Sequence, residues 1–68
     1  MAGFVLDRLE HKFQVGARVW VSGYHYLGQG TVVKVVQHLF EAPEYVVEFD
    51  QFGQRRLSES RLEEVQHG

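Results

Sequence analysis

Residues 44–53 read EYVVEFDQFG, and this stretch decides the fold. Successive side chains of an extended chain point to opposite faces. Tyr45, Val47 and Phe49 therefore share one face, and the other face carries Val46, Glu48 and Asp50. Such alternation is typical of a strand with one buried side. Residues 51–53 predict a tight hairpin turn, because their glycine adopts a positive φ without strain. The stretch therefore predicts a β-hairpin with an apolar inner face.

Further strands are predicted on both sides of this hairpin. The segment ARVWVS alternates, and TVVKVVQH is rich in β-branched residues, which suit a pleated sheet. The loop between these two segments, GYHYLGQG, is punctuated by glycines. The segment LFEAP predicts a turn, because its proline cannot donate to a sheet. The predicted strands are residues 17–22, 31–38, 44–50, 54–58 and 62–65, with a single helical turn before the last.

Five short strands in about fifty residues indicate a small antiparallel barrel of the all-β class. We expect residues 13–66 to form the barrel and residues 1–12 to form an N-terminal arm, either frayed or coiled into one helical turn. The apolar residues of the arm, which we expect to cover one end of the barrel, are Phe4, Val5, Leu6 and Leu9.

The composition narrows the classes of protein that fit the chain. Its 68 residues are 44% hydrophobic and 24% charged, which is the balance of a folded domain rather than of a disordered tail. The absence of cysteine excludes disulfides. A net charge of −2 argues against strong non-specific binding to nucleic acid. With neither a long apolar run nor an evident signal peptide, we expect no membrane association and a cytoplasmic location.

The pattern F-x-V-G-A-R-V-W-V, Y-L-G-x-G-T-V-V, Y-V-V-E-F-D and S-x-L-E spans residues 13–65. It resembles the SH3-like barrel of the Tudor type. The resemblance implies a five-stranded antiparallel SH3-like (Tudor-like) barrel. It also implies a non-catalytic module that recognises a segment of a partner protein, since small barrels of this frame serve many binding tasks.

The aromatic residues carry the main binding hypothesis. In chromatin Tudor domains, rings from the first loop and the third-strand hairpin form a cage that attracts a methylated cation by cation–π contacts. The resemblance places such rings and one carboxylate in an aromatic-lined groove between the first loop and residues 51–53. An alternative is that Phe49 packs in the core with its strand neighbours. The predicted ligand-binding residues are Tyr24, Tyr26, Phe49, Asp50 and Phe52.

A second surface is predicted on the outer face of the sheet. Trp20 lies opposite Val19 and Val21 in its strand, so we expect it to point away from the interior. It would belong to an interface for a homo-oligomer, or it would be covered by Phe4 and Leu6 of the arm. The predicted interface residues are Trp20, Val32, Val36 and Val46.

The basic residues give a third hypothesis, contact with nucleic acid. Lys34, Arg56 and Arg61 are the candidates, but acidic neighbours such as Glu48 and Glu59 favour local ion pairs. The four histidines have no ligand spacing, so we expect no metal. There is no Ser-His-Asp arrangement with an elbow motif and no phosphate-binding glycine loop, so we expect no catalytic residues and no cofactor.

An enzyme alternative rests on another resemblance. The pattern F-x-x-G-x-R-V and the stretch at residues 43–48 are similar to type II dihydrofolate reductases, in which four copies enclose one pore. The positions that match their catalytic stretch are Arg55-Arg56-Leu57-Ser58 here, and the catalytic lysine is absent. The activity is therefore not carried over, while a homo-oligomeric barrel with a shared small-molecule pore stays open.

Overall fold

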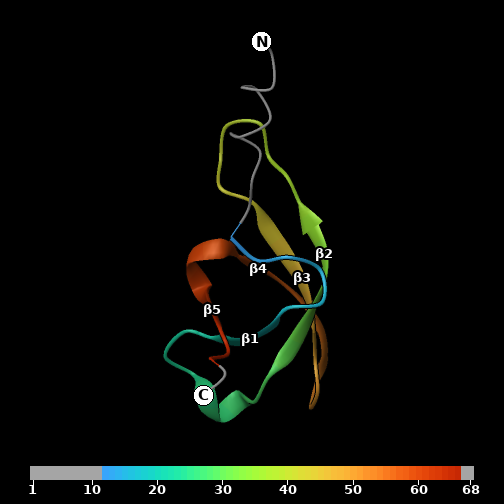
Figure 1. Ribbon diagram of the computed structural model, residues 1–68, viewed down its shortest axis with the longest axis vertical. Helices are drawn as coiled ribbons and strands as arrows, with labels where there is room; N and C mark the ends of the chain where they lie inside the picture. Colours follow the sequence, from blue (N-terminus) through green and yellow to red (C-terminus); the bar gives the residue numbers. More distant parts are fainter. Residues whose placement is uncertain (1–11, 67–68) are drawn as a thin grey trace.

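The computed structural model describes residues 12–66, which form an antiparallel sheet of five short strands (Figure 1). Each predicted strand corresponds to an observed one. The strands are β1 (Arg18–Val21), β2 (Gly30–Val36), β3 (Glu44–Phe49), β4 (Gly53–Ser58) and β5 (Leu62–Glu64). Two 3₁₀ turns, η2 (His25–Leu27) and η3 (Glu59–Arg61), complete the described elements. The predicted N-terminal arm spans residues 1–12, of which residues 1–11, including those expected to cover Trp20, lie outside the described residues.

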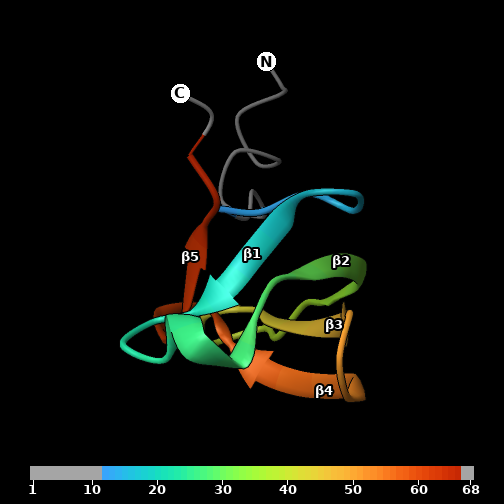
Figure 2. The same ribbon diagram turned by 90° about the horizontal axis from the view of Figure 1, so that it is seen from below.

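The strands follow the order β4-β3-β2-β1-β5, and the sheet curves strongly (Figure 2). The last strand returns to the first, with Val21 opposite Leu62. Within the described residues β4 and β5 do not pair, so the sheet is not closed. The prediction of a closed barrel is therefore not confirmed. The reason is local: η3 joins the two edge strands directly, and the three residues of β5 all pair with β1.

The core consists of the predicted inward faces of β1 and β3, joined by residues from other elements. Tyr45, Val47 and Phe49 are buried, as the alternation predicted. The same holds for Val19 and Val21. The buried hydrophobic residues are Phe13, Val19, Val21, Val32, Tyr45, Val47, Phe49 and Leu62.

The alternation fails in β2. Val32 lies opposite Val47, but Lys34 lies opposite Val46, so Val33 is an extra residue in this strand. Such a bulge shifts all later side chains by one position. The prediction that Val32 is an interface residue on the outer face is therefore wrong, because Val32 points inward and is fully buried.

Two glycines of the hairpin region are required by geometry. A Cβ at Gly30 would lie 2.5 Å from Val47 Cγ1 and 2.9 Å from Phe49 Cδ1, both in the core. Gly53 has a φ of 88°, as its turn required.

Among the described residues, no helix has the length and apolar character needed to cross a membrane.

Candidate functional site

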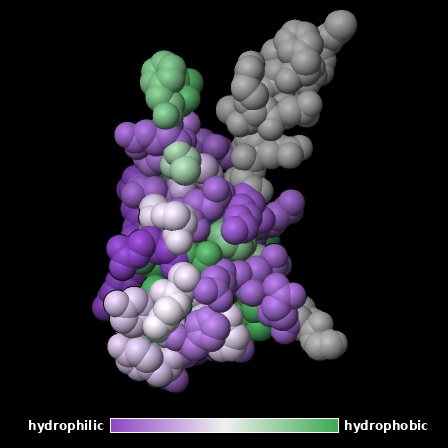
Figure 3. Space-filling model, turned by 90° about the vertical axis from the view of Figure 1, so that its left-hand side faces the viewer, coloured by the Kyte–Doolittle hydropathy of each residue, from purple (hydrophilic) through white to green (hydrophobic). Residues whose placement is uncertain are grey.

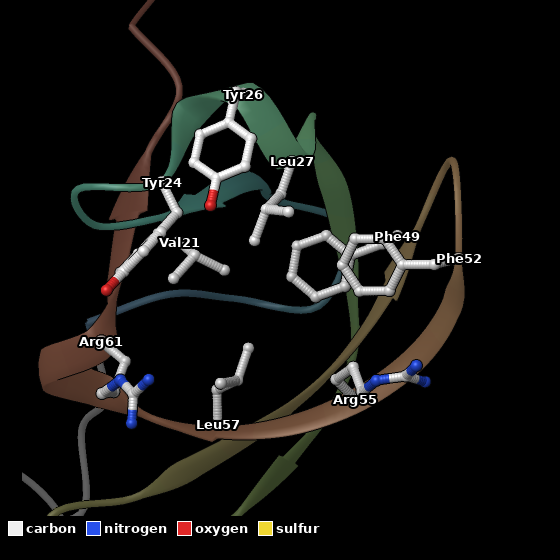
Figure 4. Close-up of a pocket in the computed structure, with 9 residues that line it drawn as sticks. All are labelled: Val21, Tyr24, Tyr26, Leu27, Phe49, Phe52, Arg55, Leu57 and Arg61. Atoms are coloured by element: carbon white, nitrogen blue, oxygen red, sulfur yellow. The ribbon is translucent and has the colours of Figure 1, made fainter.

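A cavity of about 310 Å³ opens between η2, the turn after β3, and the edge strand β4 (Figure 4). Its walls are mostly aromatic and aliphatic, and Figure 4 shows Val21, Leu27 and Leu57 pointing into the space between the rings. We call it the aromatic pocket. Its lining residues are Val21, Tyr24, Tyr26, Leu27, Phe49, Phe52, Arg55, Leu57 and Arg61.

Four of the five predicted ligand-binding residues line this pocket. Tyr24 and Tyr26 are 47% and 77% exposed, with ring centroids 6.0 Å apart, so both rings are accessible to a ligand. Phe49 is buried and belongs to the core, as the alternative interpretation held. Phe52 stacks on it at a centroid distance of 4.6 Å. The pocket therefore has a rigid phenylalanine wall that is continuous with the core and a more exposed tyrosine wall.

Asp50, the fifth predicted residue, does not line the pocket. Its Oδ2 accepts a hydrogen bond of 2.7 Å from Arg18 Nη2, and its Oδ1 accepts one of 3.2 Å from Arg18 Nη1. The hydrogen bonds from the guanidinium hold the pKa of the Asp50 carboxyl below its ordinary value. Arg18 is fixed in turn by Gln29 and Thr31. The carboxylate expected in the cage is thus committed elsewhere.

Two arginines stand at the pocket instead. Arg55 Cζ lies 5.1 Å from the ring centroid of Phe52, and Arg61 lies on the opposite side of the cavity (Figure 4). Among the described residues neither guanidinium has a carboxylate partner, and no acidic side chain lines the pocket. Arg61 was predicted as a nucleic-acid contact and Arg55 was missed as a site residue. The sequence feature that could have identified Arg55 is its position two residues before Leu57, because this spacing puts both side chains on the inward face of β4.

The tyrosine wall is anchored from behind. His25, between Tyr24 and Tyr26, stacks on Trp20 with centroids 4.3 Å apart and an interplanar angle of 12°. His25 Nε2 lies 3.1 Å from Glu63 Oε1, while Ser22 Oγ donates a hydrogen bond of 2.8 Å to Glu63 Oε2. These contacts, first from Ser22 and then from His25, lower the pKa of Glu63. Trp20, predicted as an interface residue, thus packs against η2 and borders a second hollow of about 480 Å³.

The other predicted residues are distributed over the outer face. Lys34 and Arg56 both lie beside Val46, one on each neighbouring strand. Arg56 Nε donates a hydrogen bond of 2.8 Å to Glu44 Oε1, a local pairing of the expected kind with an acidic residue that the prediction did not name. Val36 and Val46 are half-buried. Arg61 is separate from this pair, so the three basic candidates do not form one surface.

The described part of the chain brings no three metal-ligating side chains together. The pocket offers rings for stacking, aliphatic walls for an apolar group and guanidinium groups for an anion, which is the chemistry of a binding site.

The chain matches no protein-family model, and neither the curated proteins nor the solved structures contain a significantly similar chain.

Proposed function

We propose that this chain is a small binding module that takes up an extended segment of a partner protein in the aromatic pocket. An apolar side chain of the segment enters the cavity between the tyrosine and phenylalanine walls. Acidic groups beside that side chain contact Arg55 and Arg61. The carrying observation is the combination of exposed rings with two guanidinium groups that lack a carboxylate partner among the described residues.

The size of the pocket favours one anchoring side chain. Its volume of about 310 Å³ is at the lower end of the range for small-molecule sites, roughly 300–1,000 Å³. One large side chain and part of a neighbouring residue would fill it. Most of the binding energy would then come from a single buried anchor, as in other peptide grooves.

The charge of the pocket favours an anionic ligand over a methylated cation. A cation bound at the tyrosine wall would face Arg55 and Arg61, and none of the described lining residues is a carboxylate that could offset the repulsion. Aspartate or glutamate side chains would instead form charge-assisted hydrogen bonds with the guanidinium groups. A cage of the chromatin Tudor kind is therefore the less favoured use of the same rings.

The proposal includes an SH3-like frame. Support comes from the strand order, because a meander whose last strand returns to the first is the connectivity from which small barrels are made. The inward valines and the glycine at residue 30 support the same arrangement.

The proposal can be tested by NMR titration of the ¹⁵N-labelled full chain with peptides that share one phenylalanine. We expect a peptide with flanking glutamates to shift the amides of η2 and β4, and a peptide with flanking lysines to bind more weakly. Arg55→Gln should weaken binding of the acidic peptide by about tenfold, the value of one charge-assisted hydrogen bond. Arg56→Gln is the matched control, since the adjacent side chain points to the outer face.

Three results would contradict the proposal. A trimethyl-lysine peptide that binds better than the acidic one would restore the cage interpretation. Oligothymidylate that binds at the tyrosines with a steep salt dependence would assign the rings to base stacking. The absence of shifts at η2 and β4 with any acidic peptide would remove the pocket as a site.

A further inference from the structure

The loop between β2 and β3 presents an apolar tip that the proposed pocket does not involve. Leu39 and Phe40 at this tip are 83% and 92% exposed. Figure 3 shows apolar side chains projecting from the end of the molecule where this loop lies. A leucine and a phenylalanine exposed side by side on a small domain indicate a contact surface.

The same tip carries a negative charge. Glu41 follows Phe40 directly and is exposed, and its carboxylate has no ion-pair partner among the described residues. Glu44, at the end of the loop, is in contrast held by Arg56 and His38. The tip therefore combines an apolar anchor with a neighbouring anion, the two features that the aromatic pocket requires.

We propose that the segment bound by the aromatic pocket is the Leu39-Phe40-Glu41 tip of a second copy of this chain. The inference rests on the proposed function and names the partner of that site. Phe40 of one copy enters between the tyrosine and phenylalanine walls of the other. Glu41 then meets the guanidinium groups of Arg55 and Arg61. An exposed apolar side chain next to an anion on one surface thus matches an apolar pocket flanked by two guanidinium groups on another.

The positions of the two surfaces set the geometry of assembly. The tip and the loop that carries η2 lie at opposite ends of the molecule (Figure 1). Two copies side by side and antiparallel would fill both contacts in a closed pair, whereas a contact in line with the long axis is head-to-tail and leaves a free tip and a free pocket. Repetition of this contact gives short chains or a ring. Because one small tip buries far less than the roughly 1,200 Å² of a stable interface, the association is weak and depends on concentration.

Sedimentation equilibrium of the full chain over increasing concentration is the first test. The average mass should rise with concentration in the unchanged protein. A tip variant, Phe40→Ser, and a pocket variant, Arg55→Glu with Arg61→Glu, should each remain monomeric. Val15→Ser is the matched control, since Val15 is also apolar and 65% exposed but belongs neither to the tip nor to the lining of the pocket.

Mixing the two variants gives the decisive result. The pocket variant keeps an intact tip and the tip variant keeps an intact pocket, so an equimolar mixture should form a dimer and stop there. An assembly that persists in either variant alone would place the contact elsewhere, for instance at Trp20. A mixture that stays monomeric while the unchanged protein associates would equally overturn the tip-to-pocket contact.

A peptide titration separates this inference from the function on which it rests. The peptide VQHLFEAPE, residues 36–44, is added to the ¹⁵N-labelled tip variant and should shift the amides of η2 and β4. If only the designed acidic peptide of the preceding section binds, the pocket is a peptide site but its partner is another protein, and the self-association is disproved. If neither peptide binds, both proposals fail together.

Discussion

Tyr45 combines a fully buried ring with a hydroxyl group that joins two separate segments. The hydroxyl accepts a hydrogen bond of 3.2 Å from the Phe13 amide and donates one of 2.5 Å to Glu59 Oε2. Removing it by Tyr45→Phe deprives a buried amide and a carboxylate of this partner. We expect the free energy of unfolding to fall by about 1 kcal/mol, measured by urea denaturation at neutral pH. The exposed Tyr26→Phe serves as the control and should change nothing.

The same residue predicts a dependence on alkaline pH. Burial, and then the Glu59 carboxylate, raise the pKa of Tyr45 above its ordinary value. The unfolded chain therefore loses this proton first, at about pH 10. The contribution of the protonated Tyr45 hydroxyl to the free energy of unfolding is fully present below that pH and is lost as the pH rises through the folded-state pKa. Urea denaturation from pH 8 to 11.5 should show a shallower decline for Tyr45→Phe than for the unchanged protein, and equal declines would contradict this role.

Gly30 illustrates a residue chosen by packing rather than by backbone angle. Its missing Cβ leaves the space that Val47 and Phe49 occupy, so Gly30→Ala should overpack the core and cost about 1–3 kcal/mol. A double-mutant cycle with Val47→Ala checks the cause, because shortening Val47 removes the closest contact. We expect the double variant to be more stable than the sum of the single losses predicts. Additive losses would show that the clash is not with Val47.

The short element η2 is held in place by contacts outside itself. Its three residues are too few for a stable helix, and the stack of His25 on Trp20 with the nearby Glu63 fixes it against β1 and β5. His25→Ala should reduce local stability by about 1 kcal/mol and loosen the tyrosine wall. Trp20 is the single tryptophan, so its fluorescence reports the change directly. We expect emission at longer wavelength and weaker binding of the acidic peptide.

His38→Ala is the matched control for this element. His38 contacts Glu44 at a distance of 3.2 Å and does not border the pocket. Its removal should leave both the tryptophan emission and the peptide affinity unchanged. A similar shift in the two variants would mean that the emission reports global loosening rather than the anchor of η2.

The elements also show where sequence patterns hold and where they fail. In β1 and β3 the alternation predicted the buried side chains, because both strands run without interruption. In β2 the bulge at Val33 depends on how the strand pairs with β3, which no local pattern of valines records. At the site, the rings could be predicted from their loops. The ion pair that removes Asp50 from the site could not be predicted, because its partner Arg18 is distant in the chain and meets it only across the folded sheet.

At the scale of the whole molecule, the open seam between β4 and β5 is the main departure from the predicted barrel. Within residues 12–66, β3 has a neighbour on each side, while β4 pairs only with β3. In an antiparallel edge strand, alternate amide groups point away from the sheet and have no ladder partner. The seam therefore predicts a distinct pattern of hydrogen exchange, in which amides of β4 alternate between slow and fast, while those of β3 are all slow.

Exchange of the ¹⁵N-labelled chain into D₂O, followed by NMR, measures this pattern at each residue. Residues 54–58 should give fast exchange at every second position under conditions in which residues 45–49 remain protected. Continuous protection along β4, together with protected outward amides in β5, would mean that the two edges pair and that the barrel closes in solution. Peptide binding to the aromatic pocket tests closure of the seam independently, because Arg55 and Leu57 line the pocket from the edge strand β4. Closure of the seam would move both side chains and change the binding of the acidic peptide.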